Sequence, residues 1–120
     1  PLDRVLQHFG FAIGPGGRDR EPSERHRGLR SIVLAHGSDG FVAVFSCAEL
    51  LAEMGPTRAY VAFAHEHGEL APDEGPVRLL VPTDQKGSRA VRQLVRLEVR
   101  DARELPTDAG ATPAVPPLGP

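Results

Sequence analysis

The fold is decided by one stretch, residues 29–50, which has the sequence LRSIVLAHGSDGFVAVFSCAEL. Residues 29–35 and 41–45 are rich in β-branched and large apolar side chains, which favour strands. Between them lies a GSDG segment at 37–40. An Asp-Gly pair tolerates the positive φ angles that tight hairpin turns need. The stretch therefore predicts an antiparallel hairpin.

A helix is predicted directly after the hairpin. Ser46 is a suitable N-cap, and Glu49 stands three residues later, where it completes a capping box. We expect the helix to span residues 47–54, because the Gly-Pro pair at 55–56 consists of residues that commonly end helices.

Outside this stretch, the pattern predicts further short elements. Apolar residues recur at helical spacing from Leu2 to Phe9 and stop at Gly10, which predicts a short helix. Strands are predicted at residues 60–65, 77–81 and 91–99, and the polar segment 83–90 predicts a turn with room for one helical turn. In the last strand the side chains expected on the buried face are Val91, Val95, Leu97 and Val99. Short strands with few helices and no βαβ alternation predict an α+β fold with a largely antiparallel sheet.

The domain is expected to cover residues 1–105. Within it, residues 14–28 are rich in Gly, Arg, Glu and Pro and predict a variable loop. Residues 106–120 are mostly Pro, Ala, Gly and Thr without periodicity, which predicts a disordered tail. Because the chain begins at Pro1 and not at Met, we expect its start to have been trimmed.

Composition excludes several classes of function. The net charge of −2 and pI of about 6.2 provide no attraction to nucleic acid or to an anionic membrane. No run reaches the roughly 20 apolar residues of a membrane span. Cys47 is the only cysteine, which excludes an internal disulfide and a cysteine-based zinc site. One thiol is compatible with the periplasm and with the cytoplasm, and the pattern does not indicate an oligomeric state.

Three segments, in this order, resemble one known family. The first is the turn, strand and helix at 38–50. The second is GELAP at 68–72 with EGPVRLLVP at 74–82. The third is SRAVRQL at 88–94, continued by LEV at 97–99. Together they are similar to the oxidoreductase molybdopterin-binding domain of the sulfite oxidase type, and especially to its small bacterial relatives.

The resemblance implies the sulfite-oxidase type of α+β domain. Full-length members hold molybdenum through a cysteine thiolate and the dithiolene of a pterin, and soft sulfur ligands suit this chemistry. Their cysteine lies in an upstream segment that has no counterpart in this chain. Cys47 falls at a position that is usually apolar in relatives, so the resemblance assigns it to packing. The expected protein is a cofactor-free binding or accessory module with a protein partner, and no catalytic residue is assigned.

One segment could still bind an anion. In full-length relatives, the corresponding turn helps to hold the anionic tail of molybdopterin. The matching positions here are Ser88, Arg89 and Arg92, with Lys86 close by. A polar turn exposes backbone N–H groups, and Arg or Lys forms charge-assisted hydrogen bonds to phosphate. Two positions depart from the family: Thr83 replaces a frequent Gly, and Gln93 replaces an aromatic residue of the larger enzymes. Two interpretations stay open, a pterin- or anion-binding oxidoreductase or carrier and a row of ordinary surface residues.

A third class is a small metal-binding protein. His65 and His67 are two residues apart, so on a strand both would lie on one face and could share a metal with Glu69 or His36. A solvated hairpin turn explains the same residues, and we favour that interpretation.

Overall fold

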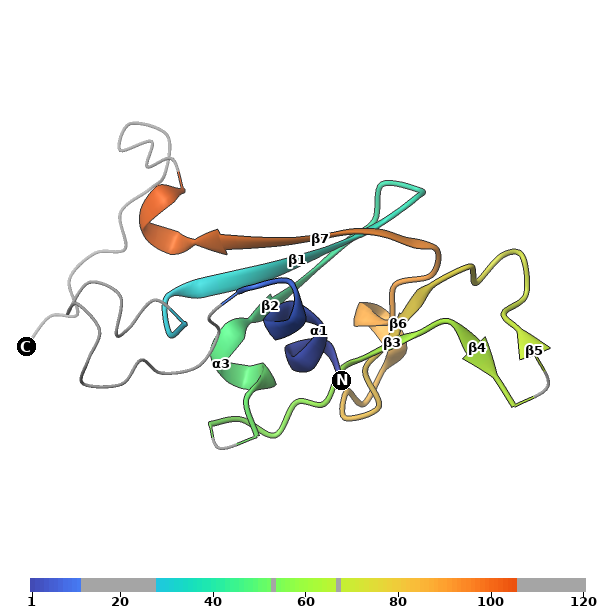
Figure 1. The fold of residues 1–120 in the computed structure, drawn as a ribbon, viewed down its shortest axis with the longest axis horizontal. Coiled ribbons are helices and arrows are strands. Elements are labelled where there is room, and N and C mark those ends of the chain that lie inside the picture. Colours follow the sequence, from blue (N-terminus) through green and yellow to red (C-terminus); the bar gives the residue numbers. More distant parts are fainter. Residues whose placement is uncertain (12–27, 53, 67, 106–120) are drawn as a thin grey trace, which may run out of the picture.

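The structure is a computed structural model that describes residues 1–11, 28–52, 54–66 and 68–105. Apart from Gly28, the variable loop predicted at 14–28 lies outside the described residues. The tail predicted at 106–120 also lies outside them. In chain order the elements are α1 (Leu2–His8), β1 (Ser31–Gly37), β2 (Val42–Ser46), α3 (Cys47–Leu50), β3 (Tyr60–Ala62), β4 (Ala64–His65), β5 (Gly68–Glu69), β6 (Arg78–Leu80), the 3₁₀ turn η1 (Gly87–Arg89), β7 (Leu94–Asp101) and the 3₁₀ turn η2 (Ala102–Glu104) (Figure 1).

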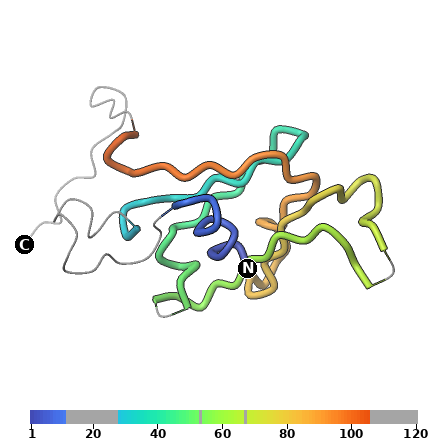
Figure 2. Tube along the Cα trace, viewed as in Figure 1, coloured from blue at the N-terminus to red at the C-terminus, as the bar shows by residue number. Residues whose placement is uncertain are grey.

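The predicted α+β class with antiparallel sheets is confirmed. The main sheet has the strand order β2-β1-β7, and both neighbours of β1 run antiparallel to it. Two smaller antiparallel pairs, β3-β6 and β4-β5, lie beyond one end of this sheet (Figure 2). The predicted hairpin is β1-β2, in which Val33 lies opposite Phe45. Gly40 has a φ of +89°, and the Asp39 carboxylate accepts a hydrogen bond from the Phe41 amide, so the turn depends on the predicted residues.

The core lies between one face of the main sheet and the two short helices. Leu2 and Leu6 of α1 are almost fully buried, because α1 packs on this face (Figure 1). The Leu2 amide also donates to the Ala59 carbonyl at 2.8 Å, which ties α1 to the segment before β3. The other buried apolar residues of this core are Val33, Ala35, Ala43, Phe45, Cys47, Leu50, Leu51, Ala59, Leu79, Val81 and Val91. No helix in the described part of the chain is long and apolar enough to cross a bilayer.

The helix after the hairpin forms with its predicted capping box but is shorter than predicted. The Ser46 hydroxyl accepts a hydrogen bond from the Glu49 amide, and the Glu49 carboxylate accepts one from the Ser46 amide. Helix α3 nevertheless ends at Leu50, and Leu51 is extended with a ψ of 127°. Leu50 and Leu51 are both buried. Successive helix residues point about 100° apart, so the change to extended backbone lets both side chains enter the core.

The strand predicted at 77–81 is shorter, β6 at 78–80, and two other predicted strands differ more. The strand expected at 60–65 is interrupted at Phe63 and forms β3 and β4, which pair with different partners. The strand expected at 91–99 begins only at Leu94, because Gln93 has a φ of +47°. The Gln93 side chain accepts a hydrogen bond from Ser38 at 2.6 Å and donates one to the Pro72 carbonyl at 2.8 Å, which fixes this bend.

The face predicted to be buried on β7 is only partly correct. Leu97 and Val99 pack against the core as expected, and Val91 is buried although it lies before the strand. Val95, in contrast, is 64% exposed. The ladder between β1 and β7 shifts register between His36 and Gly37, so the residues near Val95 no longer follow the regular alternation.

Candidate functional site

The segment predicted to bind an anion forms the turn η1 and the approach to β7. Lys86 is the N-cap of η1, and its side chain and that of Ser88 are exposed. Arg92 is 60% exposed and lies 3.5 Å from the Asp73 carboxylate. Arg89 instead turns toward β2 and α3. The basic side chains of this segment thus point to different partners, and only Lys86 and Ser88 lie together on the exposed turn.

Arg89 holds the turn η1 against the main sheet. Its Nε and Nη2 donate to the two Asp84 carboxylate oxygens at 2.8 and 2.7 Å, which is a bidentate pair. Its Nη1 donates to Glu49 at 2.6 Å and to the Val44 carbonyl at 3.3 Å. The guanidinium also lies over the Phe45 ring, 4.5 Å from its centroid. Each guanidinium nitrogen therefore already donates to a protein acceptor.

Arg89, Asp84 and Glu49 stabilise one another in their charged forms. Hydrogen bonding to Asp84 raises the pKa of Arg89, although partial burial acts against it. The pKa of Asp84 is lowered by its hydrogen bonds from Arg89. Partial burial tends to raise the pKa of Glu49, but hydrogen bonds from Arg89 and Ser46 outweigh it and the pKa is lowered. All three groups are consequently charged at neutral pH.

Cys47 is packed in the core, as the resemblance implied. It is fully buried, and burial raises the pKa of its thiol to about 11. The thiolate is the reactive and metal-binding form of cysteine. A protonated thiol beneath the sheet has neither the charge nor the access that a molybdenum ligand needs.

The described residues do not bring together the side chains of the metal-binding alternative. His65 lies on β4, whereas His36 lies on β1, where its Nε2 is 3.1 Å from the Glu98 carboxylate. His67 lies outside the described residues. Among the residues that are described, no three His, Cys, Asp or Glu side chains are grouped so that they could hold a metal ion.

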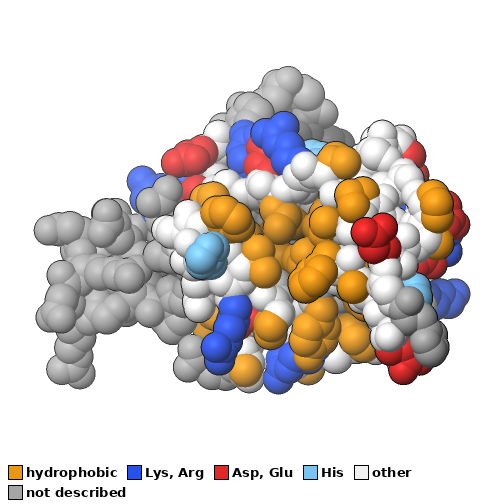
Figure 3. Space-filling view, turned by 45° about the vertical axis from the view of Figure 1, so that its right-hand side comes forward, with side chains coloured by type: hydrophobic (Ala, Val, Ile, Leu, Met, Phe, Trp, Pro, Cys, Tyr) orange, Lys and Arg blue, Asp and Glu red, His pale blue; other side chains and the backbone are white. Residues whose placement is uncertain are grey.

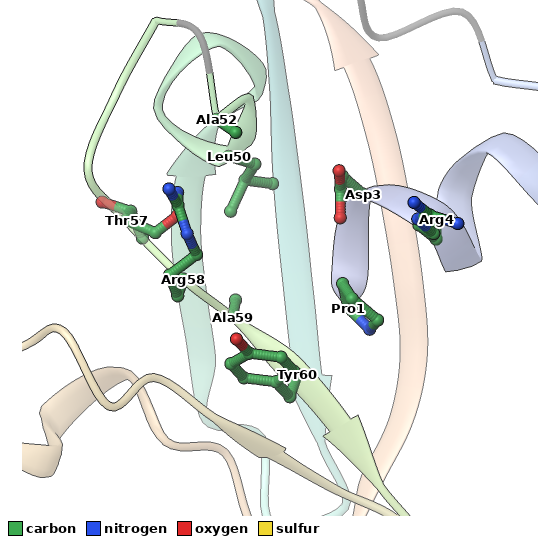
Figure 4. A pocket seen from close by; sticks show the side chains of 9 residues that line it. All are labelled: Pro1, Asp3, Arg4, Leu50, Ala52, Thr57, Arg58, Ala59 and Tyr60. Carbon is green, nitrogen blue, oxygen red and sulfur yellow. The ribbon is translucent and has the colours of Figure 1, made fainter.

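A small pocket that the sequence did not indicate lies between α1, α3 and the segment before β3. Its volume is about 220 Å³. Figure 4 shows Thr57 and Arg58 on one side and Asp3 on the other, with Leu50 between them. Arg58 uses its Nη1 to donate to the Thr57 carbonyl at 3.1 Å. Ligand pockets usually measure about 300–1,000 Å³, so this hollow is small for a cofactor.

A larger apolar groove lies between α1, β3 and the start of β7. Its volume is about 690 Å³. It is lined by Leu6, Phe9, Phe11, Val61, Val77, Leu94, Val95, Arg96 and Leu97. Phe9 is 73% exposed, Val95 64% and Phe11 41%. Figure 3 shows hydrophobic side chains gathered across one face of the molecule. Contiguous exposed apolar surface on a soluble domain commonly marks an interaction site.

Sequence patterns missed this groove because its walls come from distant parts of the chain. Phe9 fits the apolar stripe of the first helix, but α1 ends at His8 and leaves this ring outside the helix. Val95 fits the alternation of β7 and was expected on the buried face. The exposed side chains of Phe9, Phe11 and Val95 form one patch only because the fold places α1 beside β7.

Comparisons with known proteins add no relative: no family model, no curated protein and no solved structure matches the chain.

Proposed function

We propose that this chain is a cofactor-free protein-binding module, an accessory domain that resembles the molybdopterin-binding domain of the sulfite oxidase type. The observation that carries the proposal is the apolar groove between α1, β3 and β7. Eight of its nine lining residues are apolar, and only Arg96 is charged. Such a surface gains most from burying apolar side chains of a polypeptide segment.

The residues present do not fit molybdopterin well. The only thiol, Cys47, is buried and protonated at neutral pH, so it is not available as a molybdenum ligand. Arg89, the most favourable candidate for a phosphate, is already bound by Asp84 and Glu49. An arriving phosphate would have to displace two carboxylates from one guanidinium. These contacts support a structural role for Arg89 and favour the binding module over the oxidoreductase.

The anion-binding alternative keeps Lys86, Ser88 and Arg92, whose side chains are exposed. Its test uses inorganic pyrophosphate as a probe for the anionic tail of a pterin cofactor. A rise in melting temperature with pyrophosphate, lost in the Lys86→Ala/Arg92→Ala double variant, would favour this alternative. We expect no such rise.

The protein-binding role is tested with peptides selected from a random library on the wild-type chain. The affinity of a selected peptide is measured for wild type, for Val95→Asp and for Val42→Asp. Val42 is the matched control, because it is also an exposed valine on an edge strand but lies outside the groove. We expect Val95→Asp to weaken binding by about tenfold or more, since it places a charge in an apolar contact. Unchanged binding by Val95→Asp, or equal losses in both variants, would contradict the proposal.

A further inference from the structure

Strand β7 has a free edge beside the groove. In the described part of the chain, β7 pairs with β1 on one side, and no strand pairs with its other side (Figure 1). An unpaired edge presents backbone N–H and C=O groups to which another strand can add. At the first residue the edge is occupied, because the Leu94 amide donates to the Val77 carbonyl at 2.8 Å.

The ladder with β1 fixes which backbone groups point to this free edge. The Ala102 amide donates to the Arg30 carbonyl, and the same register places Arg100 opposite Ile32 and Glu98 opposite Leu34. In an antiparallel ladder, hydrogen-bonded pairs alternate with non-bonded ones. The backbone N–H and C=O groups of Arg100, Glu98 and Arg96 therefore bond to β1. The N–H and C=O groups of Leu97 and Val99 point away from β1, toward the free edge.

The sequence along this edge is complementary to itself. Residues 95–99 are Val-Arg-Leu-Glu-Val. If a second copy pairs antiparallel about Leu97, Arg96, which is 64% exposed, lies opposite the other copy's Glu98, whose carboxylate is also bonded by His36 and Arg100 of its own chain. Val95, which lies at the register shift of β7, comes near the other copy's Val99. Opposite charges directly across a ladder stabilise it, and like charges destabilise it.

Other registers are unfavourable. A shift by two residues in one direction puts Arg96 opposite Arg96, and a shift in the other direction puts Glu98 opposite Glu98. A shift by one residue would place N–H and C=O groups that already bond to β1 opposite groups that are free. It would also turn the apolar side chains of one copy to the opposite face of the joined sheet. One register thus satisfies the backbone, the charges and the apolar side chains together.

We propose that the partner of this surface is a second copy of the chain, joined through antiparallel pairing of the two β7 edges about Leu97. This inference rests on the proposed protein-binding role and names its partner. A twofold axis through Leu97 keeps the α1 side of both copies on one face of the joined sheet. The two grooves then lie next to each other, and Val95, Leu97 and Val99 of each copy become covered.

The register is tested by cysteine cross-linking. Opposite hydrogen-bonded residues lie about 5.5 Å apart between Cα atoms, which is within the range of a disulfide. The Leu97→Cys variant is therefore expected to form a disulfide-linked dimer on mild oxidation. Val95→Cys is the matched control, because its two copies lie four residues apart along the strand, about 13 Å. Equal cross-linking of both variants, or none by Leu97→Cys, would overturn the register. Cys47 remains buried in both.

The charges are tested by mixing two variants. Arg96→Glu alone places glutamate opposite glutamate, and Glu98→Arg alone places arginine opposite arginine. Each should dimerise about tenfold or more weakly than wild type in analytical ultracentrifugation. An equimolar mixture should recover the dimer, because both pairs are then of opposite charge. Circular dichroism melting checks that each variant folds. Monomers in the mixture, or undiminished dimers of either folded variant, would overturn the proposal.

The failure of this inference can be separated from failure of the proposed function. A wild-type chain that stays monomeric at its highest soluble concentration, but binds groove-selected peptides with loss in Val95→Asp, overturns self-pairing and leaves the protein-binding role. A monomer that selects no such peptide overturns both.

Discussion

Replacing Arg89 by methionine should cost about 2 kcal/mol of unfolding free energy. The change keeps an unbranched side chain next to Phe45 but removes the charge and the guanidinium that lies over the ring. Two carboxylates, Asp84 and Glu49, then lose hydrogen bonds of 2.6–2.8 Å. Hydrogen bonds to charged groups contribute about 1.5–3 kcal/mol. The side chains are 21–29% exposed, so solvent weakens the ion pairs, and about 2 kcal/mol is the net expectation.

The assay is urea unfolding followed by circular dichroism, with a thermal melt alongside. For a domain of this size, about 2 kcal/mol corresponds to a fall in melting temperature of about 10 °C. Arg92→Met is the matched control. Its guanidinium is 60% exposed and 3.5 Å from Asp73, so it should change stability by less than about 0.5 kcal/mol.

The loss should also depend on pH. The pKa values of Asp84 and Glu49 are lowered on folding from 3.8 and 4.5. Groups with lowered pKa stabilise the folded state above their unfolded pKa and lose this effect as the pH falls through the folded pKa. The difference between wild type and Arg89→Met should be full at neutral pH and shrink below about pH 4. Equal effects of Arg89→Met and Arg92→Met, or a difference that grows in acid, would refute the structural role of Arg89.

Three other predictions concern the helix after the hairpin. Gly55→Ala should lose about 2 kcal/mol in urea unfolding, because an added Cβ would lie 2.7 Å from the Glu49 Cα, whereas Gly87→Ala meets no atom and should be nearly neutral. Ser46→Ala should lower unfolding free energy by about 1 kcal/mol through loss of the capping bond, and an unchanged melting temperature would argue against the capping box. Cys47 should resist thiol reagents at pH 8 in native protein and react in denaturant, since its pKa is about 11; rapid native labelling would contradict its burial.

The hairpin and the capping box could be predicted because their signals are local. The Asp39-Gly40 turn and the Ser46/Glu49 cap each depend on residues within four positions of one another. The end of α3 could not be predicted, because it depends on Leu51 reaching a core built by other elements. Helix propensity alone predicts a helix up to Met54, before the Gly-Pro pair at 55–56. Tertiary packing overrides this preference.

The residue types of the candidate site could be predicted from the sequence, but their arrangement in space could not. The basic residues around η1 could be found from the sequence, but the Glu49 partner of Arg89 lies 40 residues away. Alternation placed Val95 on the buried face, whereas the bend at Gln93 and the register shift beside Gly37 leave it in the groove wall. Neither feature has a local signal.

Residue-resolved hydrogen exchange of β7 at low and high protein concentration tests most directly whether its edge is a protein-binding surface. Arg96 and Glu98 amides bond to β1 and should be protected at both concentrations. We predict that the Leu97 and Val99 amides exchange rapidly in dilute solution and become protected as the concentration rises. Rapid exchange of Leu97 and Val99 at every concentration would contradict the self-pairing of β7.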